Sequence, residues 1–265
     1  MVKLVEKLAI EGGKRTVPEG LVKPWPIITD EDKKALLDVL DSVQHITGAG
    51  MGGGLLWGFG PQMLALEKEW AEYVGTKYCI VTNSGTAALH ITMGAAGVGP
   101  GEEVITSAFT FLASASCVLH HNGVPIFVDI DPKTFTIDPK KIEEKITKRT
   151  KAIIPVHIHG LPAEMDEVNR IAKKHNLVVI EDACQAHGAE YKGKKVGSLG
   201  DMAAFSLNGS KNLQALEGGL FNTDREDYRD LANKVRSFGE EIKPDEPRKY
   251  NATIMGWQYR PHELT

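Results

Sequence analysis

One segment of the chain has the residue types and spacing of an anion-binding turn. Ser84, Gly85 and Thr86 directly follow an apolar run at 79–83 and open a segment of helical character. Free backbone N–H groups and the positive end of a helix attract anions, and the hydroxyls add further donors, so this turn is a candidate phosphate site. Simple capping of the helix by Ser84 explains the same residues equally well, and both interpretations stay open.

A carboxylate and a lysine follow two other apolar runs. Asp182 closes the run at 177–182, where a buried charge is costly unless it is paired or functional. Its candidate partner is a protonated heterocycle nitrogen, and the alternative is a cap for the next helix. Lys211 lies in a turn after the run at 202–208, between small and apolar neighbours. Most lysines are solvated, but a partly buried amine is a candidate for Schiff-base chemistry.

These three features together match the needs of one cofactor, pyridoxal phosphate. It requires a cup for its phosphate, an acid beside its pyridine nitrogen and a lysine that forms a Schiff base. Each feature alone is weakly informative, whereas the three at the ends of strands in one sheet are much more specific. The sequence therefore predicts a pyridoxal phosphate site.

Strands and helices must alternate to position these segments. The predicted strands are rich in Val, Ile, Leu and Ala, and they lie at 79–83, 103–107, 125–131, 152–159, 177–182, 202–208 and 218–223. The predicted helices lie at 30–43, 61–75, 84–97, 110–121, 137–146, 163–175 and 224–238. This alternation predicts an α/β fold with a mostly parallel seven-stranded sheet and helices on both faces. In such sheets ligands bind outside the carboxyl ends of the strands.

Composition and charge exclude several other classes of protein. The 265 residues are 42% hydrophobic and 25% charged, which is typical of a soluble globular protein of one large or two smaller domains. The net charge of −4 and the absence of a basic run argue against a nucleic-acid partner. No apolar run approaches the roughly 18 residues of a membrane helix, so we expect no membrane partner and a cytoplasmic location. Cys79, Cys117 and Cys184 lack metal-like spacing and predict neither a disulfide framework nor a metal site.

The sequence resembles the pyridoxal phosphate-dependent sugar aminotransferases of the DegT/StrS type, which have the fold type I architecture of aspartate aminotransferase. The matching stretches are TNSGTAAL, TFLASAS, VDIDPKTFTID, PVHIHGLPAEMD, EGG, GWQYR and the long stretch at 178–213. The long stretch, VVIEDACQAHGAEYKGKKVGSLGDMAAFSLNGSKNL, is highly specific, and the resemblance covers essentially the whole chain. It implies pyridoxal 5'-phosphate as cofactor and a homodimer with shared active sites.

The resemblance also implies the reaction and its two main residues. Lys211 would form the Schiff base with the cofactor and move the proton, and Asp182 would pair with the pyridine nitrogen. The amino donor would be glutamate or glutamine. The acceptor would be a keto sugar, nucleotide-linked in most members, or a keto cyclitol, since the LAIEGGK start at 8–14 is similar to that of members acting on keto-inositols.

Further cofactor contacts are implied by the same resemblance. Gly85, Thr86 and Ser206 would hold the phosphate, and Gln185 would lie near the ring face or its phenolic oxygen. Phe111, in the Thr-Phe pair, would stack on the ring, with plain core packing as the alternative.

Some positions depart from the family pattern. Gln258 stands in Trp-Gln-Tyr-Arg where many members have Asn, in a segment that reaches the cofactor phosphate of the partner subunit. Asn208 stands where His or Gln is common, and His159 stands where Tyr is common. The glycine-rich segment at 48–60 is longer than expected, and we interpret it as a loop on the substrate or dimer side.

The predicted organisation is an N-terminal arm at 1–30 and a pyridoxal phosphate-binding large domain at 31–265. Family members continue with a small C-terminal α/β domain, so we expect the chain to be truncated before it. Two alternatives share the cofactor: a non-catalytic or regulatory homologue, and a sugar dehydratase. Related dehydratases have histidine where Lys211 stands, which disfavours the second. A nucleotide-dependent oxidoreductase is disfavoured because no Gly-x-Gly-x-x-Gly follows a strand.

Overall fold

A computed structural model describes residues 7–21, 25–46, 60–242 and 249–264. Its α-helices are α1 (Asp30–Ile46), α2 (Pro61–Val74), α3 (Gly85–Ala95), α4 (Ala113–Leu119), α5 (Met165–His175) and α6 (Glu226–Arg236). Its strands are β1 (Tyr78–Thr82), β2 (Glu103–Ser107), β3 (Val124–Val128), β4 (Thr150–Ile154), β5 (Val178–Asp182), β6 (Glu190–Tyr191), β7 (Lys194–Lys195), β8 (Met202–Ser206) and β9 (Gly219–Thr223). The predicted loop at 48–60 lies outside the described residues except for Gly60.

Seven of these strands form one sheet in the order β1-β9-β8-β5-β4-β2-β3. β9 is antiparallel to β1 and to β8, and every other pair of neighbours is parallel. The six remaining strands therefore all point the same way, and their carboxyl ends share one edge of the sheet. This arrangement confirms the predicted mostly parallel seven-stranded sheet.

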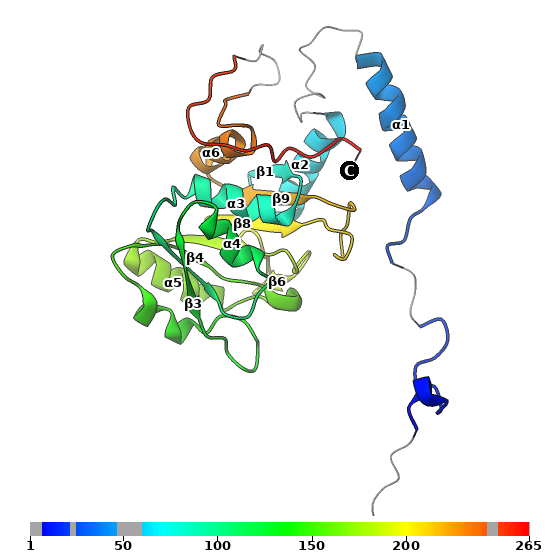
Figure 1. Cartoon of the computed structure of the whole chain (residues 1–265), viewed down its shortest axis with the longest axis horizontal. Helices are drawn as coiled ribbons and strands as arrows, with labels where there is room; N and C mark the ends of the chain where they lie inside the picture. The colour runs from blue at the N-terminus through cyan, green and yellow to red at the C-terminus, as the bar shows by residue number, and fades with distance from the viewer. Residues whose placement is uncertain (1–6, 22–24, 47–59, 243–248, 265) are drawn as a thin grey trace, which may run out of the picture.

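Helices lie on both faces of the sheet (Figure 1), and alternate side chains of the strands pack against them. On one face Ala152 and Ile154 belong to the core cluster that α3, α4 and α6 complete. On the other face Ile153 packs with the apolar residues of α5, and Phe205 of β8 lies 5.1 Å from Trp70 of α2, ring centroid to ring centroid. The two-residue period of a strand produces this division, and it confirms the predicted helices on both faces.

The prediction of a helix at 137–146 is wrong. The segment instead contains two short 3-10 helices, η3 (Pro139–Lys141) and η4 (Glu143–Lys145). The carboxylate of Asp138 accepts the N–H of Lys140 at 3.0 Å, and Ile142 between the two turns is fully buried. A capping side chain and one buried anchor therefore suffice for two tight turns, and the chain then continues extended at Ile146.

The strand predicted at 152–159 is also too long. β4 ends at Ile154 because Pro155 has no N–H to extend the ladder. The chain then turns into the 3-10 helix η5 (Ile158–Gly160), in which His159 has a positive φ of 52°. The N–H of His157 donates to the carbonyl of Asp182 at 3.0 Å, so this turn lies directly against the end of β5.

A small hairpin of β6 and β7 completes the fold, and the apolar pattern does not predict it. Its turn residues Lys192 and Gly193 both have positive φ, 51° and 79°, as two-residue hairpin turns require.

α1 stands apart from the layered body (Figure 1), with Leu36, Leu37 and Leu40 exposed. Within the described residues no helix is both long and apolar enough to cross a membrane.

Candidate active site

The predicted site residues follow the ends of three strands that run in the same direction. β1 ends at Thr82, β5 ends at Asp182 and β8 ends at Ser206. β5 and β8 are direct neighbours, with Asp182 opposite Ala204, while β9 alone separates β8 from β1. The three segments singled out in the sequence thus lie along one part of the same sheet edge.

The turn after β1 forms the N-terminus of α3. Ser84 caps this helix, because its hydroxyl accepts the N–H of Ala87 at 3.0 Å. The capping interpretation is therefore confirmed for Ser84. The N–H groups of Gly85 and Thr86 precede the capped one and have no place in the hydrogen-bond ladder of the helix. They are placed to bind an anion, so capping by Ser84 and anion binding by its neighbours are compatible.

Two glycines allow the backbone of this turn to lie very close to strands β8 and β9. A Cβ on Gly85 would lie 2.7 Å from the Cβ of Ser206 and 3.1 Å from the Sγ of Cys184. A Cβ on Gly219 would lie 2.3 Å from the carbonyl oxygen of Ser84. β9 and β8 therefore pack directly against the turn, and this contact explains both Gly85 and Gly219, the first residue of β9.

Asp182 lies in the densest part of the site and is only 5% exposed. Its Oδ2 accepts the hydroxyl of Ser114 at 2.5 Å, and its Oδ1 accepts the N–H of Cys184 at 3.2 Å. The sequence prediction did not single out Ser114, which belongs to α4. The four-residue spacing of Thr110 and Ser114 in TFLASAS is the signal that could have indicated it, since such a pair shares one helix face.

Lys211 lies in the turn between β8 and β9 and is half-buried. Its N–H donates to the carbonyl of Asn208 at 2.8 Å, which closes the turn. Burial and the charge of Asp182 raise the pKa of the Cys184 thiol well above its ordinary value, and the positive charge of Lys211 opposes this effect. The ammonium group of Lys211 is thus close enough to Cys184, the residue that packs against Gly85, to influence its thiol electrostatically.

The other two predicted contacts lie toward the mouth of the site. Gln185 accepts the N–H of His159 through its Oε1 at 2.8 Å, which joins the segment after β5 to the turn after β4. The Phe111 side chain is 69% exposed, so it is not part of the core. Its carbonyl accepts the N–H of Ser114 at 3.2 Å, which places Phe111 one turn from the residue that binds Asp182.

These residues fit the groups that pyridoxal phosphate presents. The free N–H groups of Gly85 and Thr86 at the start of α3, with the hydroxyls of Thr86 and of Ser206, which packs closely against Gly85, supply donors for a phosphate. The buried carboxylate of Asp182 matches a cationic ring nitrogen, and the half-buried amine of Lys211 matches an aldehyde carbon. No group of three or more His, Cys, Asp or Glu side chains in the described segments is arranged to hold a metal ion.

A C-terminal segment lies against the same turn. The N–H of Asn83, next to Ser84, donates to the carbonyl of Tyr259 at 2.8 Å. The hydroxyl of Tyr259 is 2.7 Å from Nδ1 of His90 on α3, and the His90 ring lies 4.5 Å from the Trp257 ring. Gln258 between these anchors is exposed. The anchors therefore fix the exposed Gln258 close to the candidate phosphate-binding turn.

This anchor predicts a pH dependence of stability. Burial, together with the neighbouring His121 and His120, lowers the pKa of His90 to about 3. The unfolded chain takes up this proton near pH 6.5, so stability is full above that pH and is lost as the pH falls toward 3. The slope should reach at most about 1.4 kcal/mol per pH unit from His90. Urea unfolding at pH 7.5 and at pH 5.0 measures it.

The same unfolding measured on His90→Gln provides the control. The slope should decrease without vanishing, because burial also lowers the pKa of His121. Hydrogen bonds to Lys174 and His175 lower the pKa of Glu143 to about 2, and such carboxylates lose their contribution mainly below about pH 5, so they contribute little between pH 7.5 and pH 5.0. A wild-type stability that is equal at both pH values would contradict the prediction.

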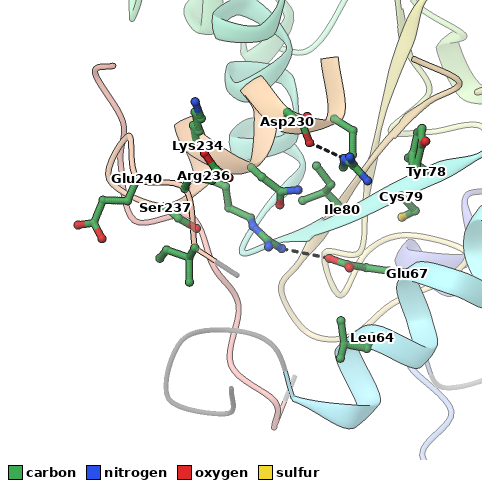
Figure 2. A pocket seen from close by; sticks show the side chains of 14 residues that line it. Leu64, Glu67, Tyr78, Cys79, Ile80, Asp230, Lys234, Arg236, Ser237 and Glu240 are labelled. Atoms are coloured by element: carbon green, nitrogen blue, oxygen red, sulfur yellow. Dashed lines mark hydrogen bonds and ion pairs between the residues drawn. The ribbon is translucent and has the colours of Figure 1, made fainter. Parts of the chain in front are cut away.

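A cavity of about 590 Å³ lies beside the edge strand β1, between α2 and α6, and none of the predicted site residues lines it. Figure 2 shows Arg236 of α6 pointing toward Glu67 of α2 across it. The guanidinium of Arg236 is 3.1 Å from the Glu67 carboxylate and donates to the carbonyl of Val81 at 2.9 Å. These hydrogen bonds of Arg236 connect the outer edge of β1 to α2 and α6. The role of Arg236 here is therefore structural.

The fold and the comparisons with known proteins agree on the class of protein. The α/β unit with one antiparallel strand in a seven-stranded sheet matches the large domain of fold type I pyridoxal phosphate enzymes. The model of the DegT/DnrJ/EryC1/StrS aminotransferase family matches residues 39–265. The chain belongs to this family, as its resemblance predicted.

Named relatives and solved structures support this assignment. GDP-perosamine synthase of Caulobacter vibrioides is 46% identical over 199 residues, 75% of this chain and 52% of its own length. An L-glutamine:2-deoxy-scyllo-inosose aminotransferase of Streptomyces lividus is 36% identical over 246 residues, 92% of this chain and 56% of its own. The structure of NtdA from Bacillus subtilis with bound cofactor PMP is 34% identical with a TM-score of 0.77, covering 98% of this chain and 58% of that one. The chain spans about half the length of the curated relatives it matches.

Proposed function

We propose that this chain is the cofactor-binding part of a pyridoxal phosphate-dependent aminotransferase that acts on a keto sugar or a keto cyclitol. The observation that carries the proposal is the meeting of three features at one sheet edge: the Gly85 turn against Ser206, the buried Asp182 and the half-buried Lys211. Membership of the aminotransferase family supports the same conclusion.

Each residue has a defined role in this proposal. Bound pyridoxal phosphate acts as an electron sink for the carbon that gives up or accepts the amino group. Lys211 would hold the cofactor through its amine, and the same amine, once released, would serve as the group that takes up and returns the proton. Asp182 keeps the ring nitrogen charged, because a nearby negative charge favours the protonated form. The N–H groups and hydroxyl of Gly85 and Thr86, with Ser206, hold the phosphate.

The substrates and the assembly are part of the proposal. The names of the relatives from C. vibrioides and S. lividus support a sugar or cyclitol acceptor, and the second also names glutamine as donor. The exposed Gln258 beside the phosphate turn and the exposed leucines of α1 support a homodimer with shared sites. The free thiols of Cys79, Cys117 and Cys184 support the reducing cytoplasm as location.

A regulatory role is the second candidate. A relative from Geobacillus stearothermophilus, 45% identical over 206 residues, is named a pleiotropic regulatory protein. The two candidates differ in the fate of the bound cofactor. An enzyme passes the amino group of glutamate or glutamine to the cofactor, whereas a protein that only binds the cofactor leaves it unchanged.

The test is the visible absorption of the purified chain with added pyridoxal phosphate. We expect a yellow band, a borohydride-fixed label on Lys211 in peptide mapping, and bleaching of the band by glutamate or glutamine. A labelled Lys211 whose band neither donor bleaches would favour the regulatory candidate. Absence of any band would contradict the proposed cofactor site.

A further inference from the structure

The carboxylate of Asp182 is held by a hydroxyl from a distant part of the chain. The Ser114 side chain is fully buried and donates to Oδ2 of Asp182 at 2.5 Å. The N–H of Cys184 reaches the other oxygen, Oδ1, at 3.2 Å. The carboxylate is thus fixed from two sides, by α4 and by the segment that follows β5. A charged acceptor bonded in this way is held in one orientation.

The hydroxyl of Thr110 extends the hydrogen bond between Ser114 and Asp182 toward the surface. Oγ1 of Thr110 lies 2.7 Å from Oγ of Ser114. A hydroxyl has one proton to donate, and Ser114 gives its proton to Asp182, so Thr110 must donate to Ser114. The chain of hydroxyls therefore runs in one direction, from Thr110 through Ser114 to Asp182. Hydrogen bonds in such a chain polarise one another, which strengthens the bond that ends on the carboxylate.

Two cysteine thiols also lie near the buried negative charge of Asp182. Cys117, one turn further along α4, is fully buried, and burial together with the charge of Asp182 raises the pKa of its thiol. Burial, the charge of Asp182 and a side-chain hydrogen bond to Asp182 raise the pKa of the Cys184 thiol as well. Both sulfurs therefore stay neutral, and the Ser114 hydroxyl makes the short 2.5 Å hydrogen bond to the carboxylate.

We propose that Thr110 and Ser114 are positioning residues that orient the Asp182 carboxylate and stabilise its negative charge toward the ring nitrogen of pyridoxal phosphate. This inference rests on the proposed function, since it assumes the pairing of Asp182 with that nitrogen. Neither hydroxyl needs to touch the cofactor, because both act through Asp182. The segment TFLASAS thereby gains a role apart from the stacking predicted for Phe111.

The experiment compares variants that differ by single hydroxyls. Ser114→Ala removes the donor to Asp182, and Thr110→Val removes the second hydroxyl while keeping the shape of the side chain. Thr110→Ser keeps that hydroxyl and is the conservative partner. Ser116→Ala is the matched control, because Ser116 lies on the same helix and its side chain makes no hydrogen bond within the described residues. Thermal unfolding without cofactor checks that each variant is folded.

Two measurements report on Asp182 without relying on turnover. The dissociation constant of pyridoxal phosphate should rise about 10-fold or more in Ser114→Ala, as expected for a lost bond to a charged group. It should rise about 2- to 10-fold in Thr110→Val, which loses a neutral bond. The pH midpoint of the visible absorption band should shift in both variants, since the ring nitrogen is then held less firmly in its charged form. Thr110→Ser and Ser116→Ala should match the wild type.

The outcomes separate this inference from the proposed function. A wild type that binds pyridoxal phosphate at Lys211, with Ser114→Ala and Thr110→Val binding as tightly and titrating at the same pH, would overturn the hydroxyl chain alone. An equal loss in Ser116→Ala would overturn it as well, since helix damage rather than the lost hydroxyl would then be the cause. A wild type that takes up no pyridoxal phosphate would overturn the proposed function and this inference together.

Discussion

Replacement of Lys211 by arginine should abolish covalent capture of pyridoxal phosphate while leaving the protein folded. Arginine keeps the positive charge that attracts a phosphorylated ligand, but its guanidinium stays protonated and is no nucleophile. Borohydride reduction followed by peptide mapping should give no label at position 211. Amino transfer from glutamate or glutamine, where the wild type supports it, should fall by about 100-fold or more, because the lysine also carries the proton.

The structure explains why the fold should survive this change. The Lys211 side chain is half-buried in a turn, and within the described residues no hydrogen bond or ion pair of its ammonium group holds the turn together. The melting temperature should therefore stay within about 2 °C of the wild type. Lys133→Arg is the matched control, since Lys133 is an exposed lysine in the loop after β3 at the same sheet edge. Covalent labelling that persists in Lys211→Arg would contradict the assigned nucleophile.

Much of the fold could be predicted because the strands of a parallel sheet are buried on both faces. Such strands are continuous apolar runs, and all seven runs in the sequence became strands of one sheet. The prediction was wrong where local contacts outweigh periodicity. The pattern at 137–146 is helical, yet the Asp138 cap and the burial of Ile142 produce two short turns. Strand β4 stops early because Pro155 interrupts its ladder.

The candidate site could be predicted only in part, for a different physical reason. Asp182 and Lys211 stood out because a carboxylate and an amine next to apolar runs are unusual in themselves. Ser114 is an ordinary serine in a small-residue helix, and its partner lies 68 residues further along the chain. The identity of such a partner depends on strand order, which neighbouring residues do not encode. Residue-level roles in the cofactor site therefore stay predictions, while the contacts that support them come from the structure.

The partners of Glu181, the neighbour of Asp182 in β5, could likewise not be predicted from neighbouring residues. They form a hydrogen-bond network beneath the site. Its side chain is fully buried, and Oε2 accepts the N–H of Gly197 at 2.8 Å and lies 2.9 Å from Nε2 of His157. Oε1 accepts the N–H groups of Leu199 and Gly200 at 2.7 and 2.8 Å. One carboxylate thus joins the loop before β8 to the turn after β4.

The tautomer of His157 follows from this geometry. Nδ1 of His157 accepts the N–H of Ala163 at 3.1 Å, so it carries no proton. The proton of the neutral ring is then on Nε2, which donates to Glu181. The carboxylate therefore accepts four hydrogen bonds, and its loss would leave two buried donors, on His157 and Gly197, and two half-buried donors, on Leu199 and Gly200, without this partner. Unpaired buried donors are costly, because they have given up water and received nothing in its place.

Glu181→Leu should consequently lower the free energy of unfolding by about 3–5 kcal/mol. A loss of this size corresponds to a fall of roughly 6–20 °C in melting temperature for a chain of this length. Glu181→Gln retains one oxygen acceptor for the loop N–H groups and should lose less. Glu190→Leu is the control, because Glu190 is exposed and its ion pair within the described residues is with Lys195 of the hairpin, where ion pairs contribute little. Thermal and urea unfolding of the three variants measure the differences.

Glu181→Leu should also weaken the cofactor site. β5 carries Glu181 and Asp182 in succession, and the turn after β4 donates through the N–H of His157 to the carbonyl of Asp182. Loosening of this turn should weaken pyridoxal phosphate binding in Glu181→Leu even at temperatures where the protein is still folded. If the variant instead melts like the wild type, the network of Glu181 does not support the fold, and the placement of Asp182 must depend on its other contacts, the pairing of β5 with β8 and the hydrogen bonds to Ser114 and Cys184.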